Sequence, residues 1–344
     1  MKRQDTLDLE LAVFRFLIRP RGFLLLPTHT KGASLRGGFG QAFRRVTCPL
    51  GRSDCRQSQC QQPHSCLYGQ IFETPRPLDA PVLRGQSHIP HPFVLEPPLT
   101  LQRHFGPEDS LDFRLILIGP TIEYLPYFLF AFEELGRQGL GHPRARAPFN
   151  LEAVYLVRPE GEELIFSGRE RRIRYSGERL RAGELMQLAS PRQARRQLEV
   201  EFLTPARLKH QGEPAQRLSF RILFGVLLGR LSSLCAFYGS HPLELDFKGL
   251  LAESERVQVE RDGLKYVYYA KRSSRGRGKM PLGGLIGRIR FGAPPEELGR
   301  FLPFLRLGQY LHVGGGTAFG QGQYRLHEEI GQAQEPTHTG PLLS

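Results

Sequence analysis

The sequence lacks tryptophan, has only three methionines and five cysteines, and is short of acidic residues relative to basic ones. It also lacks the apolar run of a signal peptide, because Met1–Leu11 is charged, and no apolar stretch approaches the ~20 residues of a membrane span. We therefore expect a cytoplasmic protein with no membrane partner. Cysteines in that compartment indicate metal ligands or free thiols rather than disulfides. The missing tryptophan excludes nothing.

Basic residues dominate the charge. The 344 residues include 47 Lys+Arg against 34 Asp+Glu, which gives a formal net charge of +13. Most of the excess is arginine, whose planar guanidinium suits phosphate oxygens and stacks on bases. An anionic lipid surface is the alternative partner, but we find no basic amphipathic helix rich in large apolar residues. Composition therefore favours a nucleic acid over a membrane.

A glycine-rich stretch, LHVGGGTAFGQGQY, occupies residues 311–324. Its five glycines are Gly314, Gly315, Gly316, Gly320 and Gly322. The stretch follows a predicted helix at 296–307 and precedes a predicted strand at 323–327, whereas a dinucleotide-binding loop follows a strand and opens a helix. Glycine permits positive φ and close approach of the backbone, and exposed N–H groups can surround an anion. We predict that these five glycines bind an RNA backbone; a flexible turn is the alternative.

The second half of the chain predicts the element order β-α-β-β-α-β. Its predicted elements are a strand at 198–203, a helix at 215–237, a hairpin of 257–260 and 266–270 turned at Asp262-Gly263, a strand at 284–291, and then the helix, glycine loop and strand described above. This order is typical of a ferredoxin-like domain.

The first half fits the same plan, with insertions after its first helix. Its predicted elements are strands at 7–18, 67–72, 93–95, 111–118 and 149–157, a segment at 22–26 that extends or pairs with the first strand, and helices at 35–46 and 122–135. Like the second half, it ends in a helix, a glycine-containing loop (136–141) and a strand. We therefore predict an α+β fold of tandem ferredoxin-like (RRM-like) domains: 1–159 with a cysteine-rich insertion at 48–66, a connecting segment at 160–197, 198–330 with the glycine loop, and a flexible tail at 331–344.

Four of the five cysteines lie in one short polar segment with the spacing C-x6-C-x4-C-x5-C: Cys48, Cys55, Cys60 and Cys66. Four thiolates complete the tetrahedral shell of a structural zinc ion, and a metal could order a segment that has no core of its own. His64 could replace one cysteine, and free thiols are the alternative. Cys235 lies in an apolar helix and is predicted to be part of the core.

Four segments carry a resemblance to a known family. EFLTPARL (201–208), GLIGRIRF (284–291) and LGQYLHVGGGTAFGQGQY (307–324) resemble the C-terminal half of CRISPR-associated repeat-cleaving endoribonucleases of the RAMP superfamily. SLRGGFGQAFRR (34–45), followed by cysteines, resembles one branch of that family. The resemblance implies tandem ferredoxin-like domains and metal-independent cleavage of precursor CRISPR RNA within each repeat, without a catalytic cofactor and with the product usually kept bound. The implied partners are CRISPR repeat RNA and other CRISPR effector subunits, for a monomer or homodimer.

Metal-free RNA cleavage uses the 2′-hydroxyl of the substrate as nucleophile and needs a proton acceptor, a proton donor and a cation for the developing charge. The catalytic histidine of the family lies near the first helix, and His29 is the only histidine before Cys48. The resemblance therefore implies His29 as general acid or base, with Lys31 beside it stabilising charge. Tyr68 is the candidate for the tyrosine partner of the family, and His312 is the second candidate for the histidine. A solvated or packed loop histidine is the alternative for either position.

Three basic groups are candidates for gripping phosphate. The first is Arg36, Arg44 and Arg45 on the first helix; the second is Lys271, Arg272, Arg275, Arg277 and Lys279 in a Gly/Ser-rich loop; the third is Arg169, Arg171, Arg172 and Arg174 in the connecting segment, where a solvated charged face is the default. Three functions remain open: a repeat-specific endoribonuclease, a non-catalytic RAMP-fold subunit that binds guide RNA, and a zinc-stabilised RNA-binding protein outside CRISPR systems.

Overall fold

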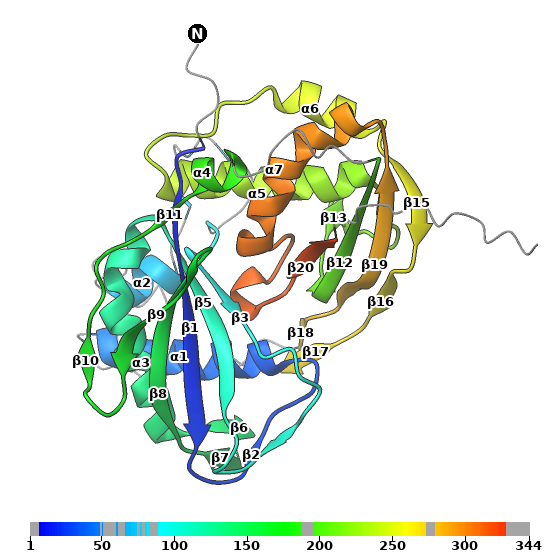
Figure 1. Cartoon of the computed structure of the whole chain (residues 1–344). Helices are drawn as coiled ribbons and strands as arrows, with labels where there is room; N and C mark the ends of the chain where they lie inside the picture. Colours follow the sequence, from blue (N-terminus) through cyan, green and yellow to red (C-terminus); the bar gives the residue numbers. More distant parts are fainter. Residues whose placement is uncertain are drawn as a thin grey trace, which may run out of the picture.

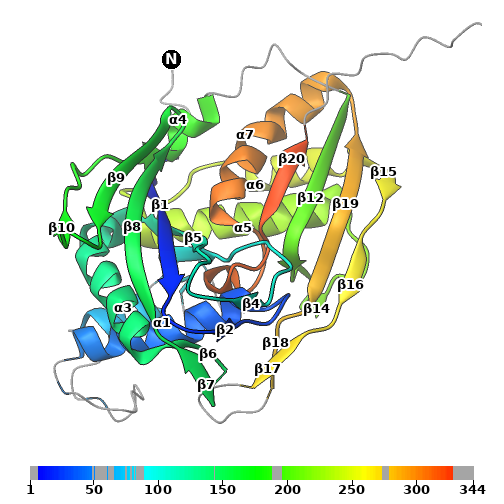
Figure 2. The same ribbon diagram turned by 60° about the horizontal axis from the view of Figure 1, so that its bottom comes forward.

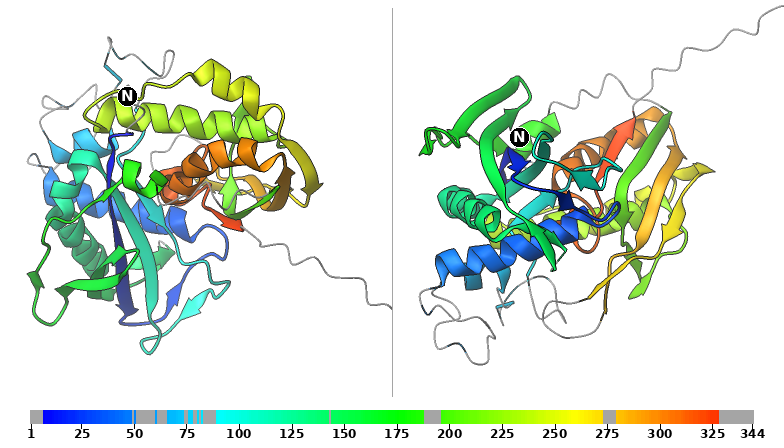
Figure 3. Two further views of the ribbon diagram at one scale, coloured as in Figure 1. Left: turned by 45° about the horizontal axis from the view of Figure 1, so that its top comes forward. Right: turned by 90° about the horizontal axis from the view of Figure 1, so that it is seen from below.

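Two antiparallel sheets, each covered by helices on one face, make up the structure (Figure 1), which is a computed structural model. It describes residues 7–48, 50, 60, 66–73, 76–77, 80, 82, 89–142, 144–187, 196–272 and 279–327, with the backbone alone at 271–272 and 279–281. Seen from below, the first sheet lies on the left and the second on the right (Figure 3).

The first half has the ferredoxin-like plan that its sequence predicts. Its elements are β1 (Glu10–Pro20), α1 (Lys31–Thr47), β3 (Phe93–Glu96), β5 (Leu111–Ile118), α3 (Leu125–Gln138) and β8 (Phe149–Arg158). The four strands are antiparallel in the order β8-β1-β5-β3, and α1 packs beside α3. In β1, Phe14, Phe16 and Ile18 alternate toward the first core, which explains the buried face of the strand.

The second half repeats this order. Its elements are β12 (Gln197–Ala206), α5 (Phe220–Tyr238), β15 (Gln258–Asp262), β16 (Lys265–Val267), β19 (Gly284–Gly292), α7 (Pro295–Leu311) and β20 (Tyr324–His327). The sheet order is β15-β19-β12-β20, so the last strand again lies beside the first. The predicted tandem ferredoxin-like fold is therefore confirmed.

The remaining elements are short. They are β2 (Leu24–Leu25), α2 (Leu67–Phe72), β4 (His104–Phe105), the 3₁₀ helix η2 (Gly119–Tyr124), β6 (Leu140–His142), β7 (Ala145–Ala147), β9 (Gly161–Ser167), β10 (Arg172–Ile173), β11 (Leu180–Arg181), α4 (Ala182–Gln187), β13 (Lys209–His210), β14 (Glu213–Pro214), α6 (Phe247–Ser254), β17 (Ala270–Arg272), β18 (Lys279–Pro281) and the 3₁₀ helix η4 (Thr317–Phe319). β2 pairs with β4 and not with β1.

The segment predicted to connect the halves is part of the first sheet instead. β9 pairs with β8 across a two-residue turn at Pro159-Glu160, β10 pairs with β9, and β11 pairs with β1. The charged residues in this segment suggested a solvated linker, but strands at the edge of a sheet tolerate charge on their exposed face.

The predicted hairpin at Asp262-Gly263 is wrong. β15 and β16 both pair with β19, one after the other, so they form one interrupted edge strand. The Asp262 carboxylate accepts a hydrogen bond from the Leu264 N–H at 3.0 Å, and the Gly263 N–H donates to the Arg288 carbonyl at 2.9 Å. The Asp-Gly pair therefore bends the chain by an Asx turn without reversing it.

Residues 67–72, predicted as a strand, form the helix α2. The Cys66 Sγ accepts a hydrogen bond from the Gly69 N–H at 3.3 Å, which caps the first turn. Tyr68, Ile71 and Phe72 are buried at helical spacing against the first core. A short apolar run without alternation does not distinguish a strand from one buried helical face.

Each half has its own core, and each core takes residues from the other half. Leu7, Leu9 and Leu11 precede or begin β1 but lie in the second core, whereas Ala318 of the glycine loop lies in the first. Helix α5 has 19 residues and is apolar enough to cross a membrane by length and composition, contrary to the expectation that no stretch approaches that length. Half of its apolar window is buried, so packing in the second core accounts for its composition.

Candidate active site

The glycine loop, residues 312–323, connects α7 to β20 and packs against the first half. Within it, Ala318 is 3% exposed and belongs to the first core. A Cβ on Gly32 of α1 would clash with the Phe319 carbonyl oxygen, and one on Gly320 would lie 2.6 Å from the Leu95 carbonyl oxygen of β3. Glycine at 32 and 320 therefore lets the loop backbone contact α1 and β3 directly.

Most of the loop's amides donate hydrogen bonds to the protein itself. The Gly315 N–H donates to the Arg207 carbonyl at 3.0 Å, that of Gly322 to Pro205 at 3.0 Å, and that of Gly320 to Thr317 at 2.9 Å. The prediction that these three amides surround a phosphate is therefore wrong. Contact of RNA with Gly314, Gly316 or the outer surface of the loop stays a prediction.

The packing at Gly320 predicts a stability difference that a matched substitution can isolate. Gly320 and Gly212 both have positive φ, +75° and +88°, but a Cβ on Gly212 would have nothing within 4 Å. Gly212→Ala should lower the free energy of unfolding by about 1 kcal/mol through backbone strain, and Gly320→Ala by about 3 kcal/mol because the Cβ also meets β3. Urea denaturation measures both; equal losses would contradict the packing role of Gly320.

His29 lies in the loop before α1, where the two halves meet. Its imidazole is exposed and stacks on the ring of Tyr269, with 5.2 Å between ring centroids and 20° between planes. Tyr269 comes from the second half, directly before β17, and its carbonyl accepts a hydrogen bond from the Leu282 N–H at 2.7 Å. The β17–β18 ribbon therefore starts at His29 and the N-terminal end of α1 (Figures 1 and 2).

The ribbon carries the basic loop that the sequence singles out. The backbone of Lys271, Arg272 and Lys279 is paired between β17 and β18, while Arg275 and Arg277 lie outside the described residues. Sequence reasoning missed Tyr269, although the run YVYY at 266–269 directly before a basic loop is a signal that could have found it.

Lys31 holds the His29 loop from inside. Its side chain is almost wholly buried, and its ammonium donates to the Thr28 carbonyl at 3.0 Å and the Thr100 carbonyl at 2.6 Å. Burial lowers the pKa of this amine. The ammonium therefore points at protein carbonyls, and the role predicted for it, contact with the cleaved phosphate, has no support from this geometry.

His312 and Tyr68 are both buried. The His312 ring is fully buried between the Gln321 carbonyl oxygen, 3.1 Å from Nδ1, and the Glu96 Oε1, 3.0 Å from Nε2. The Tyr68 hydroxyl lies 3.3 Å from the Glu73 Oε1, and its ring stacks on Phe72 in the first core. Of the three candidates for proton transfer, His29, Tyr68 and His312, the structure exposes His29 alone.

The arginines on α1 also contact protein groups. The Arg36 guanidinium lies over the rings of Phe72 at 4.3 Å and Phe319 at 5.3 Å, so a cation–π contact joins the glycine loop to the first half. The Arg44 guanidinium lies 6.0 Å from the Tyr68 ring, and Arg45 is exposed with an Nη1 4.0 Å from Glu134. Binding of phosphate by these three arginines stays a prediction.

The cysteine segment is only partly described. Cys48, Cys60 and Cys66 are free cysteines, and Cys55 and His64 lie outside the described residues. Within the described residues, no group of three or more His, Cys, Asp or Glu side chains could hold a metal ion. Cys66 instead caps α2, and Cys235 is buried in the second core as predicted, where burial raises the pKa of its thiol to about 12. Zinc remains a prediction that rests on spacing alone.

Comparison with known proteins adds the family. Residues 200–324 match the family model of the CRISPR-associated endoribonuclease Cas6, and residues 9–178 match a family model described as an N-terminal domain. The second half is a Cas6 domain. The predicted resemblance to repeat-cleaving endoribonucleases of the RAMP superfamily is thus confirmed, and the Cas6 domain contains the whole glycine loop.

Relatives of the whole chain agree with this assignment. An uncharacterized protein of Archaeoglobus fulgidus is 23% identical over 299 residues, 86% of this chain and 91% of the relative. Two solved structures, a Cas6 product complex and Thermus thermophilus Cas6, are 18% and 16% identical, each with a TM-score of 0.52; the alignments cover 92% and 93% of this chain and 98% and 99% of theirs. A partial Cas6-RT-Cas1–Cas2 complex, at 13% identity and a TM-score of 0.58, covers 98% of this chain and 48% of that chain. These structures share the fold of the Cas6 chain.

Proposed function

We propose that the chain is a cytoplasmic endoribonuclease that cleaves precursor CRISPR RNA within its repeats without a metal ion and retains the product. The observation that carries the proposal is His29, an exposed imidazole held where the Cas6 domain meets the first half. Its unperturbed range near neutrality suits proton transfer at cellular pH. The basic ribbon beside it supplies the positive charge that an RNA strand needs for binding.

In the proposed reaction, the ribose 2′-oxygen attacks the adjacent phosphorus while the bond to the 5′-oxygen of the next nucleotide breaks. One proton leaves the 2′-hydroxyl and one reaches the 5′-oxygen, so the products are a 2′,3′-cyclic phosphate and a 5′-hydroxyl. His29 carries one of these protons. Tyr269 fixes the plane of its imidazole by stacking, and Lys31 braces the loop through the Thr28 carbonyl.

Charge on the phosphate would be met by main-chain groups as well as by the ribbon. Helix α1 begins two residues after His29, and the positive end of its dipole points toward that loop. The Ala33 and Ser34 N–H groups both bond to the Thr30 carbonyl, at 3.0 and 3.2 Å, which holds the first turn in place beside His29. A phosphate at this helix end would gain from the same electrostatics as other anions bound there.

A second function is favoured by one specific observation. The Lys31 ammonium and the Tyr68 hydroxyl, two of the groups implied for catalysis, both contact buried protein groups. A chain with only His29 facing solvent could bind repeat RNA as a non-catalytic RAMP-fold subunit of a CRISPR effector complex.

Incubation of the purified chain with repeat RNA in EDTA separates these two functions. We expect cleavage at one position, because the proposed chemistry needs no metal ion, with a cyclic phosphate on the 5′ fragment. Mapping the fragment ends and measuring the affinity on the same samples reports both steps. Tight binding without any cleavage would favour the subunit and refute the nuclease.

A further inference from the structure

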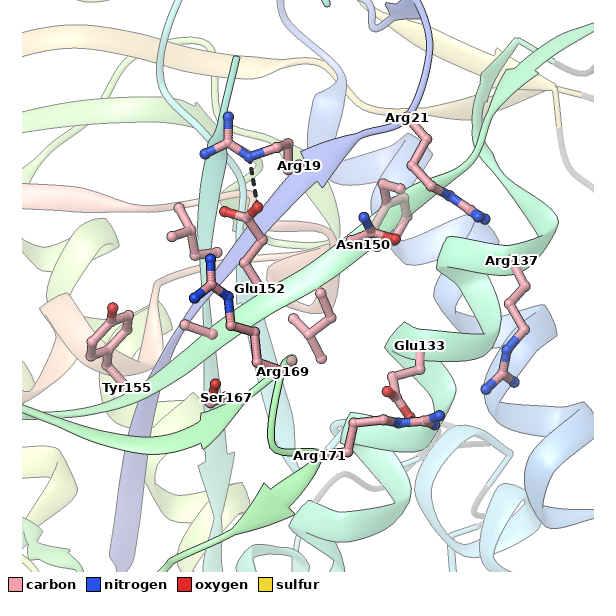
Figure 4. A pocket seen from close by; sticks show the side chains of 15 residues that line it. Arg19, Arg21, Glu133, Arg137, Asn150, Glu152, Tyr155, Ser167, Arg169 and Arg171 are labelled. Atoms are coloured by element: carbon pink, nitrogen blue, oxygen red, sulfur yellow. Dashed lines mark hydrogen bonds and ion pairs between the residues drawn. The ribbon is translucent and has the colours of Figure 1, made fainter. Parts of the chain in front are cut away.

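A polar groove runs along β8 where this strand loses its partner (Figure 4). β9 pairs with β8 from Ala153 to Arg158, and the Gly168 N–H closes the pairing with a 2.7 Å bond to the Glu152 carbonyl. Beyond that point, residues 149–151 pair with β1 on one side only in the described part of the chain. The space beside them has a volume of about 840 Å³.

Arginines from both faces of the sheet line this groove. They come from β1, the turn after β1, α3 and the β9–β10 loop: Arg19, Arg21, Arg137, Arg169 and Arg171. Only two carboxylates line it with them, Glu133 and Glu152. Five guanidiniums against two carboxylates leave a clear surplus of positive charge. The connecting-segment arginines, which the sequence left as a solvated face by default, therefore have a place in a built concavity.

Two of these arginines keep their side chains available. Arg19 lies 2.6 Å from Glu152 and Arg171 lies 3.3 Å from Glu133, so each of these cations already has an anionic partner. Arg21 and Arg169 are exposed, and neither guanidinium has a hydrogen bond or ion pair with any described residue. They come from opposite sides of the groove, as Figure 4 shows.

The groove favours an extended polyanion over an acidic peptide strand. A peptide that added to β8 would need a run of free backbone groups, and only residues 149–151 are open, directly after Pro148. Guanidiniums spread along a groove instead match phosphates spaced along a nucleic-acid strand. The exposed aromatic lining offers no free stacking face, because the Arg15 guanidinium covers the Tyr155 ring at 4.3 Å. Binding would therefore read backbone charge and not bases.

The groove is also remote from His29 and the glycine loop. The loop contacts the first sheet at β3, whereas β8 lies beyond β5 and β1 in the order β8-β1-β5-β3. In Figure 1, β8, β9 and α3 lie on the side of the molecule away from the second half. A strand in this groove would be a part of the RNA separate from the bond being cleaved.

We propose that this groove binds the sugar–phosphate backbone of single-stranded RNA, independently of sequence, as a second RNA site beside the one at His29. The identity of the ligand as RNA rests on the proposed function, while the binding of a polyanion rests on the groove alone. In a precursor transcript, the segment that a sequence-independent site suits is the variable RNA that flanks each repeat.

The test uses the full chain and two fluorescent probes, a 20-nucleotide oligouridine without repeat sequence and a minimal repeat RNA. The variant Arg21→Ala/Arg169→Ala removes the two available guanidiniums; Arg217→Ala/Arg256→Ala removes the same charge from exposed positions outside the groove. We expect the groove variant to lose about tenfold in oligouridine affinity, with a salt dependence (log Kd against log salt) shallower by about 1.4, since each lost single-strand contact removes about 0.7. The control variant should lose less than about twofold.

Several outcomes would overturn the proposal. These are equal losses in the groove and control variants, an unchanged oligouridine affinity, or a polyglutamate probe that binds through Arg21 and Arg169 while oligouridine does not. Cleavage of the minimal repeat should be equal in wild type and the groove variant, and equal Tm values show that both fold. Failure of the wild type to cleave refutes the nuclease but leaves the oligouridine comparison intact, so the two failures are distinguishable.

Discussion

His29→Ala is expected to slow cleavage of repeat RNA by about 10²- to 10⁴-fold, the usual contribution of a positioned acid or base. Affinity for the same RNA should stay within about twofold, because the imidazole is exposed and its printed contact is the stacked Tyr269 ring. Single-turnover cleavage with excess protein in EDTA measures the chemical step, and filter binding measures the affinity separately.

The matched control for this variant is His241→Ala. His241 is also an exposed loop histidine, but it lies in the second half after α5. Its removal should leave both the cleavage rate and the affinity unchanged. An undiminished rate for His29→Ala would remove this residue from the mechanism, and a parallel loss in both variants would point to a general effect on charge or folding.

The fold was predictable where local patterns carry the information. The apolar run at 111–118 became β5 with the same bounds, and Pro126 correctly placed the start of α3 near Leu125. Local patterns failed where a partner decides the structure. The alternation at 161–167 became a strand because β8 has a free edge for it, and Asp262-Gly263 bends a strand that β19 holds on both sides of the turn.

The candidate site followed a similar division. His29 was found from the resemblance of the sequence around α1, because its position relative to that helix is local information. Tyr269 could not be paired with it, since 240 residues of chain separate the two rings and only the packing of both halves brings them together. The burial of Lys31 depends likewise on Thr100, 69 residues away. Residue type and spacing predict chemistry, whereas exposure is a property of the assembled cores.

The glycine loop shows how one residue pattern serves two needs. Glycine was predicted to expose amides to a phosphate, but three of those amides bond to protein carbonyls and the small side chains admit β3 and α1. The same loss of Cβ allows a backbone to approach a ligand or another backbone. Here it joins the Cas6 domain to the first half, so its contribution to RNA cleavage is to hold His29 and the β17–β18 ribbon in one arrangement.

A buried His312–Glu96 pair stabilises this junction, and counting hydrogens defines its state. Nδ1 of His312 lies 3.1 Å from the Gln321 carbonyl, which can only accept, so Nδ1 carries a hydrogen. Nε2 lies 3.0 Å from the Glu96 carboxyl, so either Nε2 or that carboxyl must supply a second hydrogen. The pair therefore holds one more proton than a neutral imidazole beside a free carboxylate. His312 also has a left-handed φ of +61°, rare outside glycine, which the two ring contacts help to maintain.

His312→Ala should lower the free energy of unfolding by about 3–5 kcal/mol, because it leaves the buried Glu96 carboxyl without its partner and opens a cavity. Glu96→Gln should cost less than about 1.5 kcal/mol, because the amide N–H can donate to Nε2 of a neutral imidazole whose Nδ1 still bonds to Gln321. Guanidinium denaturation of both variants measures the difference. A loss as large in Glu96→Gln as in His312→Ala would show that the ionic form is essential, and a small loss in both would mean that the two halves are held together by their cores alone.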